Sequence, residues 1–311
     1  MIEITINKLS GELFRIVNTD KLYHNYLSIK KIFINFKLDT YFKIVNNNNI
    51  IYTDLYDLDY DNVELENILT IVLLYYDKKF IEKLKINNSI LRYASDELRN
   101  NYDIVRIACS NNFGMPLQYT SDELRNNYDI LMCSCNKYGI ALQYASDELK
   151  KNYNVVKNIC NIDGFALQYA SDKLKNNYNI AKIACSNSGF ALEYVSIELK
   201  NNYDIVKIAC SNNGLALRYA SDILQDNYDI VKIACYHNGY ALQYASISLR
   251  NNYNIVSIAC YQNGLALYYA SNSLKNNYDI VKKACYQDGF SLYYASKELQ
   301  NNSELTMIAK K

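Results

Sequence analysis

The sequence of 311 residues contains one proline and two histidines, and its charges nearly cancel, with 33 Lys and Arg residues against 32 Asp and Glu residues. A net charge of +1 provides no overall field that would attract a nucleic acid or an acidic membrane surface. Disordered chains are poor in aromatic residues, whereas this chain has 32 tyrosines and is 50% hydrophobic. These features predict a folded protein without nucleic-acid or membrane partners.

Long apolar runs are also missing. The longest, Ile68 to Tyr76 with Thr70 inside it, has about half the length that a membrane-spanning helix requires. The segment that starts at Met1 has neither a basic region nor an uninterrupted apolar region, so it does not resemble a signal peptide. We therefore expect a soluble, intracellular protein.

No pattern typical of catalysis is present. The sequence lacks the nucleophile elbow of hydrolases, the phosphate-binding loop and the dinucleotide-binding motif. His237 occupies a position that other copies of an internal repeat fill with the amides Asn212, Gln262 and Gln287, which indicates a surface residue and not a general base. We expect no enzymatic activity, no catalytic residue, no cofactor and no small-molecule ligand.

Internal repetition dominates the rest of the sequence. A unit of 25 residues recurs, with one step of 26, and each copy begins at a tyrosine: Tyr102, Tyr128, Tyr153, Tyr178, Tyr203, Tyr228, Tyr253 and Tyr278. Within one copy, the apolar residues between Ile205 and Cys210 follow the spacing of one face of an α-helix, and those between Leu217 and Leu224 do the same. The unit is therefore predicted to be a pair of helices.

A glycine separates the two predicted helices in every copy: Gly114, Gly139, Gly164, Gly189, Gly214, Gly239, Gly264 and Gly289. Helices commonly end in a left-handed residue, which glycine adopts without strain, so we interpret these glycines as C-terminal caps. Two helices of about ten residues cannot bury both apolar faces alone, so the copies must stack. The sequence predicts an all-α solenoid of helix-pair repeats at residues 91–311, preceded by a connecting helical segment at residues 77–90.

Residues 1–76 have a different pattern, with apolar and polar residues alternating at the start. Four strands are expected, at residues 2–6, 13–16, 42–45 and 68–74. A helix is expected between the second and third strands, around Ile29 and Phe33. This order predicts a compact α+β domain.

The same region is similar to ubiquitin. Residues Lys8 to Gly11 stand at the place of ubiquitin's first turn, residues 27–31 resemble its helix, and residues 69–73 resemble its last strand. The resemblance implies a β-grasp domain that docks onto ubiquitin-binding proteins. Because the chain continues through Asp77 and lacks the terminal Gly-Gly of a conjugated modifier, the domain would be an integral one. A β-grasp domain that merely starts the solenoid is the alternative.

The repeat also resembles a known family. Tyr219-Ala220-Ser221, preceded by Ala216-Leu217, matches the "AL-x-YAS" repeat of a domain-of-unknown-function family that is frequent in giant DNA viruses of amoebae. Heavy use of asparagine, which is extreme at residues 46–49, is similar to that of AT-rich viral genomes. The resemblance covers residues 81–311. It implies a helical repeat without a known activity, and a location in the host cytoplasm or the virion.

Nine cysteines raise the possibility of redox or metal chemistry. Eight of them share one repeat position on the apolar helix face: Cys109, Cys135, Cys160, Cys185, Cys210, Cys235, Cys260 and Cys285. Stacked equivalents would lie about 10 Å apart, too far for a disulfide, so we interpret them as small core residues in a reducing compartment. A redox-active thiol ladder is the less favoured alternative, because burial raises a thiol pKa.

No metal site is expected. Cys133 and Cys135 lack the further ligands that zinc needs. The acidic segment from Asp57 to Asp61 has the first spacings of a calcium loop, but it lacks that loop's glycine and its bidentate glutamate. A solvated acidic turn is the better interpretation.

Positions that differ between copies are free to meet a partner. Tyr236, Tyr261 and Tyr286 follow the repeated cysteine, where earlier copies have serine or asparagine. Tyr268 and Tyr293 stand where earlier copies have arginine or glutamine. Exposed tyrosine is enriched at binding hot spots, so these five residues are the candidate partner-binding site. The alternative is that their rings pack over the helix ends.

These observations predict a non-enzymatic protein–protein interaction scaffold, with the solenoid as its recognition surface and the first domain as a dock for host ubiquitin-pathway proteins. The alternative is a structural component of a viral particle or assembly. A helical array can also read one RNA base per repeat. We disfavour that function because residues 81–311 carry 24 Lys and Arg residues against 21 Asp and Glu residues.

Overall fold

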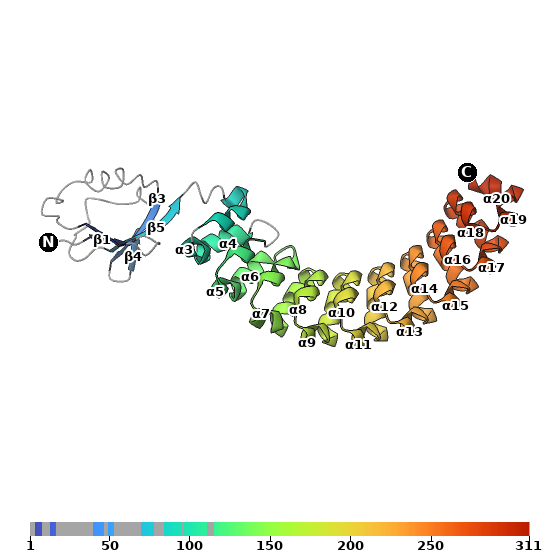
Figure 1. Cartoon of the computed structure of the whole chain (residues 1–311), viewed down its shortest axis with the longest axis horizontal. Coiled ribbons are helices and arrows are strands. Elements are labelled where there is room, and N and C mark those ends of the chain that lie inside the picture. Colours follow the sequence, from blue (N-terminus) through green and yellow to red (C-terminus); the bar gives the residue numbers. More distant parts are fainter. Residues whose placement is uncertain are drawn as a thin grey trace. The chain divides into compact units, whose positions relative to one another are not determined.

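The computed structural model describes residues 4–7, 13–16, 40–46, 49–52, 70–77, 84–94, 96–110 and 115–310 (Figure 1). The chain divides into two compact units, Met1–Leu124 and Arg125–Lys311. The boundaries predicted after residues 76 and 90 stay predictions.

The first unit contains a five-stranded sheet with the strand order β2-β1-β5-β3-β4. Its strands are β1 (Ile4–Asn7), β2 (Leu13–Ile16), β3 (Thr40–Asn46), β4 (Asn49–Tyr52) and β5 (Thr70–Asp77). β1 pairs with β5 in parallel, with Ile6 opposite Ile71. The pairs β1 with β2, β3 with β4, and β3 with β5 are antiparallel.

The predicted fold class, an α+β β-grasp domain followed by an all-α solenoid of helix pairs, is wrong. The residues described before residue 84 are strands alone, and there is one strand more than predicted. No β-grasp is seen among them, and the helix expected around Ile29 and Phe33 lies outside the described residues. From residue 84 to residue 310 the described part of the chain is helical and contains no strand.

The helical part of the first unit begins the array. Its elements are η1 (Asn88–Tyr93), α3 (Asp96–Arg99), α4 (Tyr102–Ser110), η2 (Met115–Tyr119) and α5 (Asp122–Arg125), where η denotes a 3₁₀ helix. Pro116 is buried in the first turn of η2, where a backbone N–H is not required.

In the second unit each repeat has three helical segments, not the predicted two. The long helices are α6 (Tyr128–Ser134), α8 (Tyr153–Ile162), α10 (Tyr178–Asn187), α12 (Tyr203–Asn212), α14 (Tyr228–His237), α16 (Tyr253–Gln262), α18 (Tyr278–Gln287) and α20 (Ser303–Ala309). The 3₁₀ helices are η3 (Gly139–Tyr144), η4 (Gly164–Tyr169), η5 (Gly189–Tyr194), η6 (Gly214–Tyr219), η7 (Gly239–Tyr244), η8 (Gly264–Tyr269) and η9 (Gly289–Tyr294).

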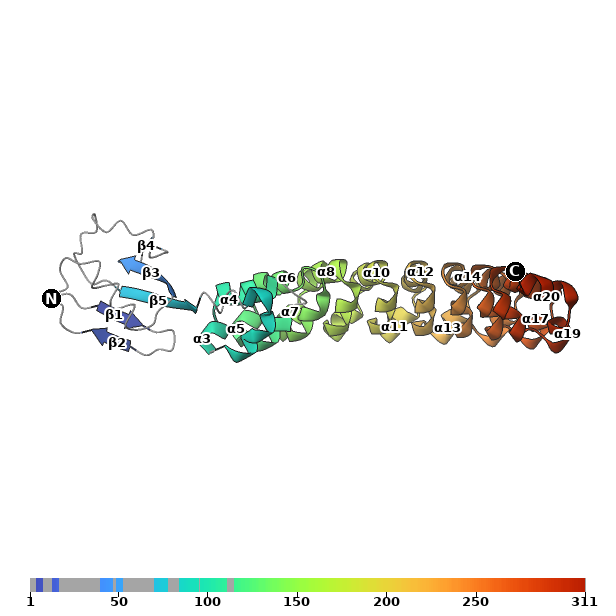
Figure 2. The ribbon, with the colours of Figure 1, turned by 90° about the horizontal axis from the view of Figure 1, so that it is seen from above.

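The short helices complete the repeats and form a row of their own. They are α7 (Asp147–Lys151), α9 (Asp172–Lys175), α11 (Ile197–Lys200), α13 (Asp222–Gln225), α15 (Ile247–Arg250), α17 (Asn272–Lys275) and α19 (Lys297–Gln300). In the second unit the long helices lie side by side, and the short helices follow the outer edge of the curve (Figures 1 and 2).

Apolar residues at the predicted helix positions form the core. In α12, Ile205, Val206, Ala209 and Cys210 are fully buried, and so are Ala216 and Leu217 of η6. The same positions are buried in the neighbouring repeats. The core is therefore continuous from repeat to repeat, which explains why a single pair of helices would be insufficient.

The glycine between the segments is not a left-handed cap. Gly214 is the first residue of η6, and a Cβ atom built on it would lie 2.2 Å from the carbonyl oxygen of Ala234 in the next repeat. Gly189 and Gly239 show the same contact, with Ala209 and Ala259. Glycine is thus required by the close approach of the neighbouring backbone, and the prediction of C-terminal caps is wrong at these positions.

Candidate functional site

The repeated serine of the Tyr-Ala-Ser motif joins consecutive repeats. Its backbone N–H donates to the preceding repeat, as from Ser221 to the carbonyl of Lys200 at 3.0 Å. Its hydroxyl donates to the side-chain oxygen of Asn201 at 2.6 Å and accepts the N–H of Leu224 at 3.4 Å. A hydroxyl with these two partners is structural and is not a candidate nucleophile.

The two asparagines that precede most of the long helices have separate structural roles. Asn201 accepts the serine hydroxyl of the next repeat, whereas Asn202 accepts the N–H of Ile205 at 3.1 Å and caps α12. At the other end of the helix, Asn213 accepts the N–H of Leu215 at 3.0 Å and caps η6. Side-chain oxygens at these positions satisfy N–H groups that the first turn of a helix leaves without partners.

An amide at the end of α10, α12 and α16 bridges two repeats. Asn212 accepts the N–H of Gly189 at 2.7 Å, and its own N–H group donates to the carbonyl of Ser186 at 2.9 Å. Gln262 likewise accepts the N–H of Gly239 at 2.9 Å. His237 stands in this position and is exposed, as predicted, with its ring 5.4 Å from that of Tyr236.

The repeated cysteines are buried and form no disulfide. All nine are reduced thiols, and the eight at the repeat position are buried, whereas Cys133 is partly buried. Burial raises the pKa of the Cys210 thiol from 9.0 to about 12, and Cys185, Cys235 and Cys260 show the same shift. A thiol that holds its proton this firmly is a poor nucleophile and a poor metal ligand.

Metal-binding groups do not converge in the part of the chain that the structure describes. Within it, no three or more His, Cys, Asp or Glu side chains gather where they could hold an ion. His24 and the acidic segment from Asp57 to Asp61 lie outside the described residues. Among the described helices, none has both the length and the apolar composition needed to cross a bilayer.

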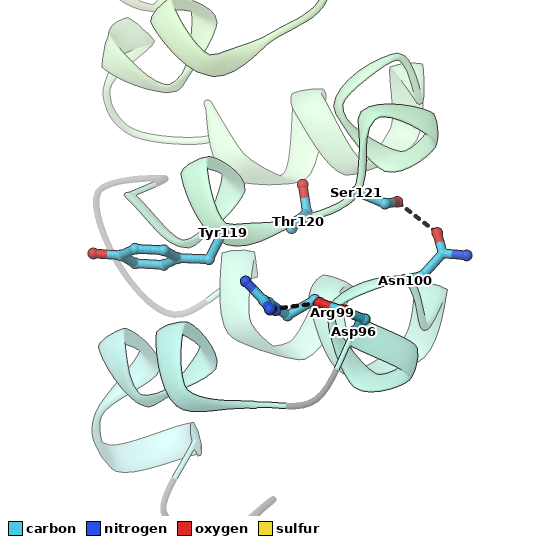
Figure 3. Close-up of a pocket in the computed structure, with 6 residues that line it drawn as sticks. All are labelled: Asp96, Arg99, Asn100, Tyr119, Thr120 and Ser121. Atoms are coloured by element: carbon cyan, nitrogen blue, oxygen red, sulfur yellow. Dashed lines mark hydrogen bonds and ion pairs between the residues drawn. The ribbon is translucent and has the colours of Figure 1, made fainter. Parts of the chain in front are cut away.

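A shallow groove in the first unit is lined by Asp96, Arg99, Asn100, Tyr119, Thr120 and Ser121 (Figure 3). Arg99 pairs with Asp96 at 2.5 Å, and the hydroxyl of Ser121 donates to Asn100 at 2.5 Å. The ring of Tyr119 points away from both pairs (Figure 3). The Ser121–Asn100 bond is the same joint that links the other repeats, so this groove belongs to the stacking.

One nitrogen atom in the groove could indicate a ligand site. Arg99 Nε is buried and has no hydrogen-bond partner among the described residues. Arg250 Nε is in the same situation, and the two arginines occupy the same position of two different repeats. The buried nitrogen is therefore not confined to the groove, and we do not interpret it as a catalytic or ligand site.

Two of the candidate tyrosines belong to an aromatic cluster on the 3₁₀ helices of the last repeats. Tyr268 meets Tyr269 and Tyr294 edge to face, with ring centroids 5.0 and 5.1 Å apart. Tyr293 meets Tyr294 at 5.5 Å, and Tyr240 meets Tyr269 at 6.4 Å. Tyr268 and Tyr293 are 55% and 79% exposed, whereas Tyr269 and Tyr294 are half-buried. The cluster therefore presents the rings of Tyr268 and Tyr293 to solvent.

The other three candidates stand at the ends of α14, α16 and α18. Tyr236, Tyr261 and Tyr286 are 70%, 79% and 68% exposed, so their rings do not pack over the helix ends. They occupy the same position of consecutive repeats, and we call them the tyrosine ladder. No ring contact joins the ladder to the cluster at Tyr268 and Tyr293 among the described residues, so the five candidates form two separate groups.

Exposed isoleucines on the short helices are a feature that the sequence analysis missed. Ile197, Ile223 and Ile247 lie on α11, α13 and α15 and are among the most exposed apolar side chains of the array. Ile197 and Ile247 replace the aspartate that begins α9 and α13, and this substitution is the signal that could have found them.

Comparison with known proteins identifies the repeat. The family model described as a domain of unknown function (DUF4116) matches six segments, at residues 77–113, 111–150, 152–200, 179–225, 227–275 and 252–300. No curated protein and no solved structure matches the chain. The family match therefore places the array among known repeats and attaches no substrate or partner to it.

Proposed function

Because the chain belongs to the family described as a domain of unknown function (DUF4116), whose repeat fills most of its length, we propose that it is a non-enzymatic scaffold for protein–protein interaction. Stacked repeats present an extended surface that partners can bind. The partner we propose is another protein, not a nucleic acid, a membrane or a small molecule.

One observation carries this proposal. Four kinds of recurring side chain are engaged in the architecture: the serine and the asparagines by hydrogen bonds, as at Ser221 and Asn202, the cysteine by burial, and the glycine by close backbone contact. The tyrosines at 236, 261 and 286 have no such engagement, because their rings are exposed and Ser186 and Ser211 stand at the same position in earlier repeats. Large exposed rings that the fold does not require are typical of binding surfaces.

The proposed absence of catalysis has support in the same contacts. The repeated side chains of a type that could act as nucleophiles are engaged in the fold: Cys210 is a buried thiol with a pKa of about 12, and the hydroxyl of Ser221 is held between two repeats. Catalytic groups instead need accessible positions and pKa values close to the working pH.

A cross-linking experiment tests the scaffold function. A photoreactive phenylalanine analogue is placed at Tyr261 of the full chain, and the same analogue at Ser211, the equivalent position without a ring, is the matched control. We expect a cross-link to a different polypeptide from position 261 and little or none from position 211. Equal cross-linking from both positions would overturn the proposal.

The same experiment separates the scaffold from a structural role in a viral particle or another assembly. If the cross-link from position 261 joins two copies of this chain, and sedimentation shows that the full chain self-associates, the array is an assembly element. A heterologous polypeptide bound to a monomeric chain supports the scaffold.

A further inference from the structure

The three tyrosines of the ladder are spaced at a regular interval, one per repeat. α14, α16 and α18 pack against one another as neighbours, and each has one ladder tyrosine at its penultimate position (Figure 1). Axes of packed helices lie about 8–10 Å apart, so equivalent side chains on successive repeats are separated by about that distance. Three exposed rings therefore form a row with one step per repeat.

A polyproline II helix has a matching period. It advances about 3.1 Å per residue with three residues per turn, so residues three apart lie on the same side about 9 Å from each other. A proline at every third residue would meet one ring of the ladder per turn. An extended β-strand advances about 3.3 Å per residue and presents one face at every second residue, so its step of about 7 Å does not match the ladder.

The chemistry of the surface also fits such a segment. No charged residue occurs between Asn251 and Leu274, which includes the middle of the ladder. Two nearby cations have partners: Lys282 pairs with Glu304 at 2.7 Å, and Lys283 donates to Ser257 at 2.7 Å. Lys232, four residues before Tyr236 on α14, is exposed. One lysine does not make the positively charged groove with which proteins bind single-stranded nucleic acid, so the charge of this surface disfavours that ligand.

Tyrosine supplies both kinds of contact that a polyproline II segment accepts. The flat ring packs against a proline ring, and the hydroxyl donates to a backbone carbonyl, which in this conformation has no internal hydrogen bond. Aromatic grooves that bind proline-rich segments in other folds use the same combination, and the preformed ligand loses little conformational entropy.

We propose that Tyr236, Tyr261 and Tyr286 form a docking site for a neutral, proline-rich polypeptide segment with a proline at every third residue. This inference rests on the proposed scaffold function and names the chemistry of its partner. The partner segment comes from another protein, because the chain itself has a single proline, Pro116, which is buried in η2.

A peptide pair of equal composition tests the period. Fluorescence anisotropy measures binding of the full chain to an uncharged peptide with proline at every third residue, long enough to span two steps of roughly 9 Å. The control peptide has the same residues with the prolines at every fourth position. We expect the first peptide to bind at least about tenfold more tightly, because only its prolines can meet all three rings.

Variants of the chain test the location. Tyr261→Ser should weaken binding of the first peptide about tenfold, and the triple change at positions 236, 261 and 286 should abolish it. Ile197→Ser together with Ile247→Ser removes exposed apolar side chains elsewhere and should leave binding unchanged. Ser186→Tyr together with Ser211→Tyr extends the ladder and should tighten binding of a proportionally longer peptide.

Several results would overturn the inference. Equal affinity for the two peptides would show that the rings are a non-specific apolar surface. If neither peptide binds while the cross-link from position 261 to another polypeptide persists, the scaffold function stands and the proline-rich ligand is wrong. Tyrosine-dependent binding of single-stranded RNA or of an oligosaccharide, without binding of the peptide, would also overturn the inference of a proline-rich ligand.

Discussion

The hydroxyl of Ser221 donates a hydrogen bond of 2.6 Å to the side-chain oxygen of Asn201, which lies in the preceding repeat. The pairs Ser196–Asn176 and Ser271–Asn251 repeat this bond at the same distance. Each joint therefore links the start of one short helix to the end of the previous one. The array is held together by these polar joints as well as by its apolar core.

Replacing Ser221 with alanine should destabilise the array locally. The change removes the bond to Asn201 and the cap on the N–H of Leu224, and losses of this kind cost about 1–2 kcal/mol in the free energy of unfolding. The measurement is urea unfolding of the full chain, combined with hydrogen exchange at the Leu224 amide, which should become faster.

Ser171→Ala is the matched control for this prediction. Its joint is incomplete, because Lys151 stands where the other repeats have an accepting asparagine or aspartate, and the Ser171 side chain makes no capping bond. The control should therefore cost less than about 0.5 kcal/mol. Equal losses for the two alanine variants would show that the joint contributes nothing to stability.

Gly214→Ala should destabilise the stack because the added methyl group has no room. The new Cβ would lie 2.2 Å from the Ala234 carbonyl oxygen and 2.9 Å from the Asn238 nitrogen, so the backbone of the next repeat must move. Overpacking of this kind costs about 1–3 kcal/mol or more. Thermal unfolding followed by circular dichroism checks the size of the loss.

Gly214→Asn distinguishes the close contact from a left-handed cap. Asparagine tolerates the left-handed conformation, so a cap position would accept it with little loss. The contact with Ala234 instead predicts that asparagine is at least as harmful as alanine. A stable asparagine variant would restore the interpretation of this glycine as a cap.

The sequence was sufficient for features that depend on local periodicity. The burial of Ile205, Val206 and Ala209 and of the repeated cysteines follows from apolar spacing, and both predictions are confirmed. The role of Gly214 was not accessible, since it depends on Ala234, which is 20 residues away in the next repeat. The 3₁₀ segment was not predicted for a different reason: apolar spacing alone does not distinguish it from an α-helical turn.

The candidate site was only partly accessible from the sequence. Variation between repeats identified Tyr236, Tyr261 and Tyr286 as surface positions, but it did not say whether the rings lie outward or fold onto the helix ends. It also did not separate the ladder from the cluster at Tyr268 and Tyr293. That separation depends on contacts between neighbouring 3₁₀ helices, such as Tyr268 with Tyr294.

The buried thiols make stability fall at alkaline pH. Burial raises the pKa of Cys210 to about 12, so between its ordinary value of 9.0 and about 12 the folded chain keeps a proton that the unfolded chain releases. The stability contribution is complete below pH 9 and is lost as the pH rises to about 12. The slope is about 1.4 kcal/mol per pH unit for each such thiol.

Cys210→Ala should therefore flatten the decline of the urea midpoint between pH 9 and pH 12 relative to the unmodified chain. As a second readout, an alkylating reagent at pH 8 should modify the partly buried Cys133 before it modifies Cys160, Cys185 or Cys210. Equal alkylation rates in the folded chain would contradict the burial argument.

Removing the tyrosine ladder should leave stability almost unchanged. The rings of Tyr236, Tyr261 and Tyr286 are mostly exposed, and Ser186 and Ser211 hold the same position in folded repeats, so each change to serine should alter stability by less than about 0.5 kcal/mol. Tyr269→Ser is the contrasting variant, because its half-buried ring meets Tyr240 and Tyr268 and should cost about 1–2 kcal/mol. The measurement is the melting temperature of the ladder variant and of Tyr269→Ser, each compared with that of the unmodified chain. If the ladder variant melts well below the unmodified chain, the three rings stabilise the fold, and their exposure cannot be taken as evidence of a binding surface.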